Sequence, residues 1–149
     1  MKINDDLKIS IELNEGFKGT IYSDTRGVAT VGYGFAVGYL TPDEIALNGG
    51  RVEPMEREAA DAILNLKLEK LLKETEAAFP WLSEHPQSVQ NTVLEMCYQM
   101  GVAKVKKFAT TLHYIRNREY DRARENALKS TWARQTPNRA QKVLAGLII

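Results

Sequence analysis

The apolar residues near the start of the chain fit two kinds of secondary structure. The four apolar residues between positions 7 and 13 alternate with polar ones, as in a strand, but Leu7 and Ile11 also lie one helical turn apart. An aspartate at position 5 or 6 can cap a helix, and Gly16 can end it in a left-handed conformation. Because both end signals agree, the sequence predicts a first helix that ends at Gly16.

Two short runs of β-forming residues come next, at Lys18–Ser23 and Val28–Tyr33. The four residues between them, Asp24-Thr25-Arg26-Gly27, have the composition of a turn in which Gly27 takes a positive φ. The sequence therefore predicts a β-hairpin with Asp24 at the start of its turn and Thr30 on the returning strand.

The rest of the chain has helical signals only. Thr41-Pro42-Asp43-Glu44 reads as a capping box with proline at the first helical position, and Gly49-Gly50 ends that short helix. Residues 54–79 are rich in Ala, Leu, Glu and Lys, which predicts a helix of about 37 Å that bridges two lobes. Further helices are predicted at 87–100, which is strongly apolar and suits a core helix, and at 103–116, 119–129 and 137–148, the last with Thr136 as its N-cap.

This order of elements predicts an α+β fold with two lobes in a single domain. Residues 1–16 form the N-terminal helix, 17–53 a small lobe that contains the strands, 54–79 the bridging helix and 80–149 a helical lobe.

Charge divides the chain more sharply than its net value of +1 suggests. Residues 1–100 have a net charge of −7 and residues 101–149 a net charge of +8. A basic half favours contact with an anionic polymer, either a nucleic acid or an acidic cell-wall glycan, although solvated helix faces explain the same pattern. No aromatic interleaving or nucleic-acid reader motif accompanies the basic residues, so nucleic acid is not expected as a partner.

Cysteine and histidine contribute no expected chemistry. Cys97 is the one cysteine and lies in an apolar helical stretch, so a buried structural thiol is expected. His85 and His113 have no Cys or His at ligand spacing, so neither a metal nor a cofactor is expected. The chain shows no secretory or membrane-spanning apolar run, which leads us to expect a cytoplasmic protein.

The candidate chemistry lies between Glu15 and Gly34. Glu15 precedes Asp24 by nine residues and Thr30 by fifteen, with glycines between them. Cleavage of a glycosidic bond needs one carboxylic acid as proton donor and a second carboxylate on the other side of the bond. Each residue alone is ordinary, but the three together predict a glycosidase, in which partial burial would raise the pKa of Glu15.

The run EGFKGTIYSDTRGVATVGYG resembles the catalytic signature of the phage-type lysozymes, glycoside hydrolase family 24, and is most similar to those of the T-even bacteriophages. Tyr98–Phe108 and Ser130–Ala140 also resemble the helical lobe of those enzymes. The resemblance implies a muramidase that hydrolyses the β-1,4 bond between N-acetylmuramic acid and N-acetylglucosamine in peptidoglycan, with inversion.

The resemblance also implies roles for individual residues. Glu15 takes the place of the general acid, Asp24 that of the second carboxylate and Thr30 that of the hydroxyl that places the attacking water. Arg139 matches an arginine that pairs with the catalytic glutamate. The residues at positions expected to bind substrate are Gly34, Gln99, Gly101, Phe108, Trp132 and Asn138, although packing in the core explains Trp132 equally well.

One position departs from the family pattern. The family usually has histidine directly after the GYG sequence, ion-paired with an aspartate on the bridging helix, whereas this chain has Phe35. An ungapped match puts the partner at Leu66, so both charges are replaced by apolar residues. Such a replacement is often neutral or stabilising. We expect Phe35 and Leu66 to touch and the chain to lose less stability at low pH.

The resemblance further implies an endolysin for host cell lysis. It would act as a monomer that waits in the bacterial cytoplasm until a holin opens the membrane, and its basic lobe would attract anionic envelope polymers. Two alternatives remain: a lytic transglycosylase, which needs no water-placing Asp–Thr pair, and a catalytically inactive wall-binding protein.

Overall fold

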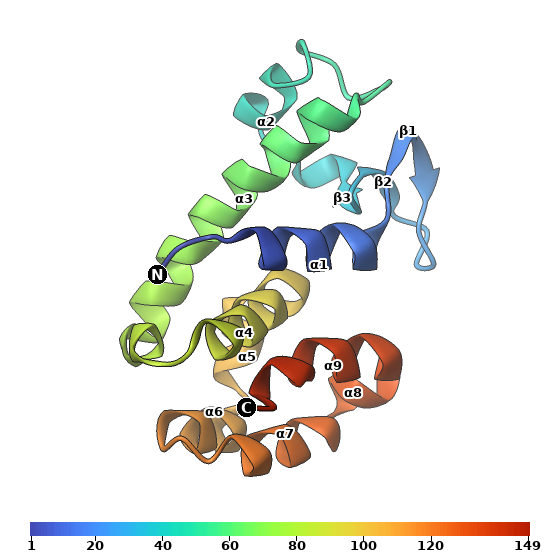
Figure 1. Ribbon diagram of the computed structural model, residues 1–149. Helices are drawn as coiled ribbons and strands as arrows, with labels where there is room; N and C mark the ends of the chain where they lie inside the picture. The colour runs from blue at the N-terminus through green and yellow to red at the C-terminus, as the bar shows by residue number, and fades with distance from the viewer. The chain divides into compact units, whose positions relative to one another are not determined.

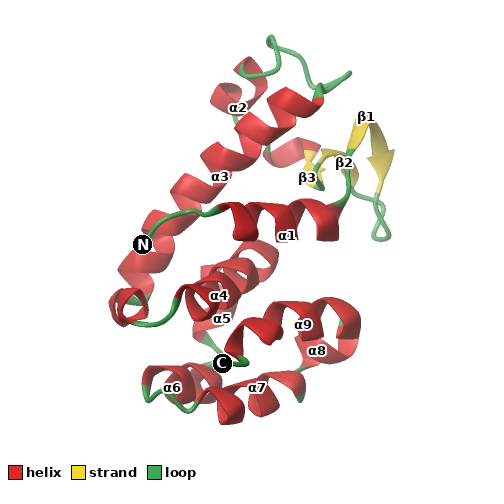
Figure 2. Ribbon diagram, in the orientation of Figure 1, coloured by secondary structure: helices red, strands yellow, loops and turns green.

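The computed structural model describes residues 1–149, which divide into two compact units. The N-terminal unit is Ile3–Lys70, and the C-terminal unit is Leu71–Ile149 together with Met1–Lys2. In chain order the elements are α1 (Asp5–Glu15), β1 (Lys18–Ser23), β2 (Ala29–Gly32), β3 (Phe35–Ala36), η1 (Val37–Tyr39), α2 (Pro42–Ala46), α3 (Arg57–Ala78), η2 (Pro80–Glu84), α4 (Gln87–Met100), α5 (Val102–Lys106), α6 (Ala109–Arg116), α7 (Tyr120–Leu128), α8 (Thr131–Gln135), α9 (Pro137–Leu144) and η3 (Ala145–Leu147), as Figures 1 and 2 show. Helices with one small antiparallel sheet confirm the α+β class.

The first helix forms where the sequence predicts it, but a different residue caps it. The side chain of Asn4 accepts a hydrogen bond from the Leu7 N–H at 2.9 Å, so the expected aspartate caps are wrong. Asp5 and Asp6 lie in the first turn instead, where negative charge favours the helix dipole. Leu7 and Ile11 are buried, as helical spacing requires, and α1 ends at Gly16 with φ of 70°.

The sheet has three strands in the order β1–β2–β3, all antiparallel. Tyr22 of β1 lies opposite Thr30 of β2, which in turn lies opposite Ala36 of β3. The predicted second run is cut short at Gly32, and the strand β3 was not predicted. Gly32 and Gly34 have φ of 69° and 73° and turn the chain back, so the continuous β pattern of the sequence becomes two strands.

The short helix α2 is held by its capping box and by an ion pair. Thr41 and Glu44 exchange the two capping hydrogen bonds, as predicted. Glu44 is only 2% exposed, and its Oε2 lies 3.1 Å from Nζ of Lys67 on α3. That same ammonium lies 5.3 Å from the centre of the Phe35 ring, which is also buried. Contact between Phe35 and Leu66 stays a prediction.

The bridging helix begins later than expected. The predicted start at Pro54 is wrong because residues 54–56 lie outside α3, where the Met55 N–H donates to the Gly19 carbonyl at 2.7 Å. From Arg57 to Ala78 the helix is continuous, and it contributes residues to both units.

In the C-terminal unit α4 is the core helix, as predicted, with eight buried residues. The segment predicted as one helix over 103–116 is two helices, α5 and α6, which meet at Phe108. The helix α8 was not predicted. Its N-cap residue is Ser130, whose hydroxyl accepts from the Ala133 N–H. Thr136 is the N-cap residue of α9, as predicted, although its hydroxyl donates to the Trp132 carbonyl and makes no capping bond to the helix.

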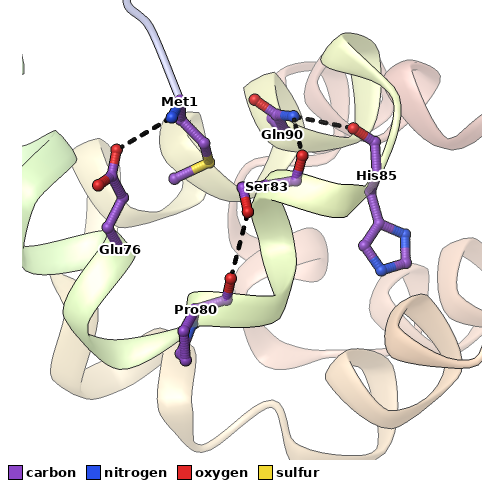
Figure 3. Close-up of polar contacts among 6 residues, drawn as sticks. All are labelled: Met1, Glu76, Pro80, Ser83, His85 and Gln90. Carbon is purple, nitrogen blue, oxygen red and sulfur yellow. Dashed lines mark hydrogen bonds and ion pairs between the residues drawn. The ribbon is translucent and has the colours of Figure 1, made fainter.

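A buried amide closes the connection between α3 and α4. Gln90 of α4 donates to the carbonyl oxygens of Ser83 and His85 at 3.3 and 2.8 Å, and Ser83 donates to the Pro80 carbonyl (Figure 3). In the same view the Met1 ammonium pairs with Glu76 at 3.2 Å. The bonds from Gln90 and Ser83 satisfy carbonyl groups of the turn after α3.

The cysteine is structural, as expected. Cys97 on α4 is 1% exposed, and burial raises the pKa of its thiol to about 11. The thiolate is therefore scarce at neutral pH, and Cys97 is not a nucleophile. No helix of the structure is long and apolar enough to cross a bilayer.

Candidate active site

The N-terminal unit contains Glu15, Asp24, Thr30 and Gly34. Glu15 is the last residue of α1, and its carboxyl group lies against Gly34 in the turn between β2 and β3. A β-carbon on Gly34 would lie 3.0 Å from Cδ of Glu15 and would overlap Oε2. The absence of a side chain at Gly34 therefore makes room for the glutamate.

Asp24 opens the turn between β1 and β2, as the sequence predicts. Its Oδ1 accepts hydrogen bonds from the backbone N–H groups of Arg26 and Val28 at 2.8 and 2.9 Å. The Val28 bond, more than any other cause, lowers the pKa of this carboxyl group. Asp24 is thus ionised at neutral pH, with one oxygen occupied by the loop.

Thr30 lies on β2 and is buried, with 4% exposure. Its hydroxyl donates to the Val28 carbonyl at 2.8 Å. The same residue, Val28, therefore donates its N–H to Asp24 and accepts from Thr30. This shared contact fixes the carboxylate and the hydroxyl relative to one another.

Tyr22 is a polar residue of this region that the sequence analysis did not single out. It lies opposite Thr30, and the Lys18 ammonium lies 4.3 Å from the centre of its ring. Burial raises the pKa of Tyr22, and the charges of Glu15 and Asp24 raise it further. The signal that could have revealed it was its place near the end of a predicted strand, two residues before Asp24 in the turn.

A second polar cluster lies beside α1. Burial raises the pKa of Glu12, and the hydrogen bond and the charge of Asp61 raise it further. The charges of Lys8 and Arg57 lower it, but by less. Asp61 also helps burial to raise the pKa of Tyr33. The cluster ties α1 to α3 within the N-terminal unit, in which Glu15 ends α1.

The C-terminal unit has a hollow of about 670 Å³ between α5, α6, α7 and α8. Phe108 and Trp132 line it with their rings in a T-shaped contact at 6.2 Å. Lys104, Lys107 and Lys129 line it as well, and no acidic residue does. The hollow is therefore an aromatic surface with a positive rim.

Of the six expected substrate-binding residues, Gly34 lies in the N-terminal unit and the other five lie in the C-terminal unit. Phe108 and Trp132 line the hollow of the C-terminal unit, and Gln99 accepts a hydrogen bond from the Trp132 indole at 3.0 Å. Trp132 is only 7% exposed, so it also packs in the core. Gly101, where α4 passes into α5 with φ of 88°, and Asn138, exposed on α9, do not line the hollow.

Sequence reasoning missed a second pair of polar residues in the hollow. The Thr111 hydroxyl, which is buried, donates to Oδ1 of Asn126 at 2.7 Å, and both residues line the hollow. Arg139 lies in the first turn of α9, and its pairing with Glu15 stays a prediction. No three His, Cys, Asp or Glu side chains come together in a way that could hold a metal ion.

Comparison with known proteins shows the family to which the chain belongs. Residues 12–149 match the family model described as phage lysozyme, a match that includes Glu15, Asp24 and Thr30. Two proteins of Dictyostelium discoideum, probable T4-type lysozymes 1 and 2, are 28% and 27% identical to the chain. Each alignment covers 93% of this chain and 91% of the relative. The chain belongs to the phage lysozyme family and is a glycoside hydrolase of the lysozyme type, acting on peptidoglycan.

Proposed function

We propose that the chain cleaves the β-1,4 bond between N-acetylmuramic acid and N-acetylglucosamine by an inverting mechanism, with Glu15, Asp24 and Thr30 as its catalytic residues. The observation that carries the proposal is the loop geometry around Val28, which holds an ionised Asp24 and the Thr30 hydroxyl together. A carboxylate fixed beside a hydroxyl is the arrangement that activates a water molecule.

The steps follow from these groups. Glu15 gives its proton to the glycosidic oxygen as the bond to the anomeric carbon breaks. A water molecule attacks that carbon from the opposite face and passes a proton to Asp24. Because the Thr30 hydroxyl proton points to the Val28 carbonyl, the Thr30 oxygen is left as an acceptor that orients this water. The product has a reducing end of inverted configuration.

The C-terminal unit supports binding of an anionic polymer. Residues 101–149 have a net charge of +8, and three lysines rim the aromatic hollow. Peptidoglycan carries carboxylate groups on its peptides, and other envelope polymers are anionic too. We propose that the hollow attracts such groups, with an affinity that falls as salt is added.

We also propose that the biological role is bacterial lysis. As an endolysin the monomeric protein would remain in the host cytoplasm until a holin opens the inner membrane, and would then act on the wall. Family membership supports this role. The role predicts that expression in a Gram-negative host lyses the cells only when a holin is expressed with it.

The activity is tested by digesting purified peptidoglycan and identifying the new ends by mass spectrometry. Reducing muramic acid ends are expected, and Glu15→Gln should lower their rate of formation by at least about 10²-fold. Proton NMR of the fresh product should show the α anomer first. Anhydro-muramic ends would instead identify a lytic transglycosylase, and binding without any cleavage would identify a wall-binding protein.

A further inference from the structure

Tyr22 shares a face of the sheet with two of the proposed catalytic residues. It lies directly opposite Thr30 in the antiparallel β1–β2 pair, and opposite residues in such a pair project to the same side. Asp24 follows Tyr22 by two residues, and its N–H still bonds to the Val28 carbonyl across the pair at 3.0 Å. Side chains two apart on a strand point the same way, and Asp24 continues the pairing directly after β1, so its side chain starts from the face that carries Tyr22 and Thr30.

The ring of Tyr22 is held in place by Lys18. The register of the β1–β2 pair shifts between these two residues, and Nζ of Lys18 lies 4.3 Å from the ring centre. A cation over an aromatic face is attracted by the ring electrons. The phenol is therefore a positioned group, and Lys18 approaches its ring face.

Both carboxylates act on the Tyr22 hydroxyl. Burial raises the pKa of the phenol, and the charges of Glu15 and then Asp24 raise it further. Charges influence a neighbour in this way only over short distances. The hydroxyl consequently stays protonated at neutral pH and can donate a hydrogen bond.

The other polar groups near this face of the sheet already have hydrogen-bond partners or a role in the proposed mechanism. Oδ1 of Asp24 accepts two backbone hydrogen bonds, and the Thr30 proton is donated to the Val28 carbonyl. The proton of Glu15 goes to the leaving oxygen in the proposed mechanism. A sugar bound here presents hydroxyl and acetamido oxygens that need a donor, and Tyr22 can supply one.

We propose that Tyr22 is a further catalytic residue, whose hydroxyl donates a hydrogen bond to an oxygen of the sugar on which Asp24 and Thr30 act. The proposal rests on the muramidase function proposed above. It explains why a tyrosine, rather than another β-forming aromatic residue, stands opposite Thr30 with a lysine over its ring.

The test compares Tyr22→Phe with Tyr39→Phe on soluble, uncrosslinked peptidoglycan strands. Tyr39 is 84% exposed in the same unit and serves as the matched control. Loss of one hydrogen bond that strengthens in the transition state should lower kcat of Tyr22→Phe about tenfold with little change in KM. Tyr39→Phe should behave as the wild type. A kcat for Tyr22→Phe within about twofold of the wild type would overturn the proposal.

A second measurement separates this role from a structural one. With ¹³C-labelled tyrosine in Glu15→Gln protein, the Tyr22 Cζ resonance should move when the same strands bind, and that of Tyr39 should not. A stationary Tyr22 resonance with bound strands would refute the proposal even if Tyr22→Phe folds poorly. If wild-type protein forms no reducing muramic acid ends, the muramidase function itself fails. If it forms them while Tyr22→Phe is unimpaired, only the role of Tyr22 fails.

Discussion

Gly34 lies against the carboxyl group of Glu15. A β-carbon added to Gly34 would lie 3.0 Å from Cδ of Glu15 and would overlap its Oε2. We therefore expect Gly34→Ala to displace the proposed general acid. A displacement of about 1 Å costs about 10²-fold in rate. Hydrolysis of peptidoglycan strands by Gly34→Ala should fall by at least that factor.

The effect of strain in Gly34→Ala can be separated from the effect of crowding. Gly34 has φ of 73°, and Gly49 has φ of 68° with no atom near the position of a β-carbon. Both alanine variants should lose about 1 kcal/mol of stability in urea unfolding, because a side chain at positive φ is strained. Gly49→Ala should keep full activity. If the two variants hydrolyse peptidoglycan equally well, crowding of Glu15 does not affect catalysis, and the role of Gly34 is limited to its backbone conformation.

The ion pair between the half-buried Lys67 and the buried Glu44 makes stability depend on pH. Burial alone would raise the pKa of Glu44. The hydrogen bond from the Thr41 N–H and the charge of the Lys67 ammonium outweigh this effect, so the pKa of Glu44 is lowered. A lowered folded-state pKa means stability that is present above the ordinary value of 4.5 and lost as pH falls through the folded value. Lys67→Met should cost about 2 kcal/mol at pH 7, because it leaves a buried charge uncompensated.

The matched variant Glu44→Gln keeps a side chain that can complete the capping box but removes the charge. Its deficit relative to the wild type should be present at pH 7 and should shrink as pH falls from 4.5 through the lowered pKa of Glu44, where that carboxylate in the wild type becomes protonated. Urea unfolding of both proteins between pH 3 and pH 7 measures this. A deficit that is constant across that range would assign the stabilisation to hydrogen bonds rather than to charge.

His85 provides a second pH-dependent contribution, in the C-terminal unit. Its Nδ1 lies 2.7 Å from the Tyr120 hydroxyl, and burial, followed by the charge of Arg118, lowers its pKa against the influence of Glu84. The unfolded chain therefore binds this proton more readily, so stability should fall as pH drops below 6.5. His85→Gln should lose part of that slope. Thermal unfolding of the two proteins between pH 5 and pH 8 provides the measurement.

The sequence predicted those parts of the fold that depend on local signals. The turn at Asp24, the capping box at Thr41 and the apolar helix at 87–100 each follow from neighbouring residues, and the structure has all three. The third strand escaped prediction because two residues cannot show a period, and because Gly32 and Gly34 interrupt the run. Likewise, α8 has five residues, too few for a helical repeat to be visible.

Contacts between distant residues explain what the sequence could not predict about the site. The resemblance named Glu15, Asp24 and Thr30, and the structure describes their surroundings, but the contact of Glu15 with Gly34 depends on how α1 meets the sheet. The lysine rim of the hollow joins Lys104 and Lys107 to Lys129, which lies more than twenty positions further along the chain. Spacing along a chain does not report such proximity.

The substitution of the family histidine by Phe35 leads to the last prediction. Phe35 is 2% exposed, with the Tyr33 ring 6.3 Å away and the Lys67 ammonium 5.3 Å from its own ring centre. A histidine placed there would be buried beside a cation, and both effects disfavour its protonation. Phe35→His should therefore lose stability as pH falls below about 6.5, where the unfolded chain takes up the proton.

Phe35→Leu is the matched control, since it loses the aromatic ring without adding a group that titrates. It should cost about 1–2 kcal/mol at every pH, as a change of shape in a packed core does. The difference in unfolding free energy between the two variants should grow from pH 8 to pH 5, while the slope due to His85 is common to both and cancels. If that difference is constant, the pKa of the histidine is the same in the folded and unfolded chains, and the neighbouring Lys67 does not govern its charge. A difference that shrinks as pH falls would instead mean that the histidine finds a carboxylate partner.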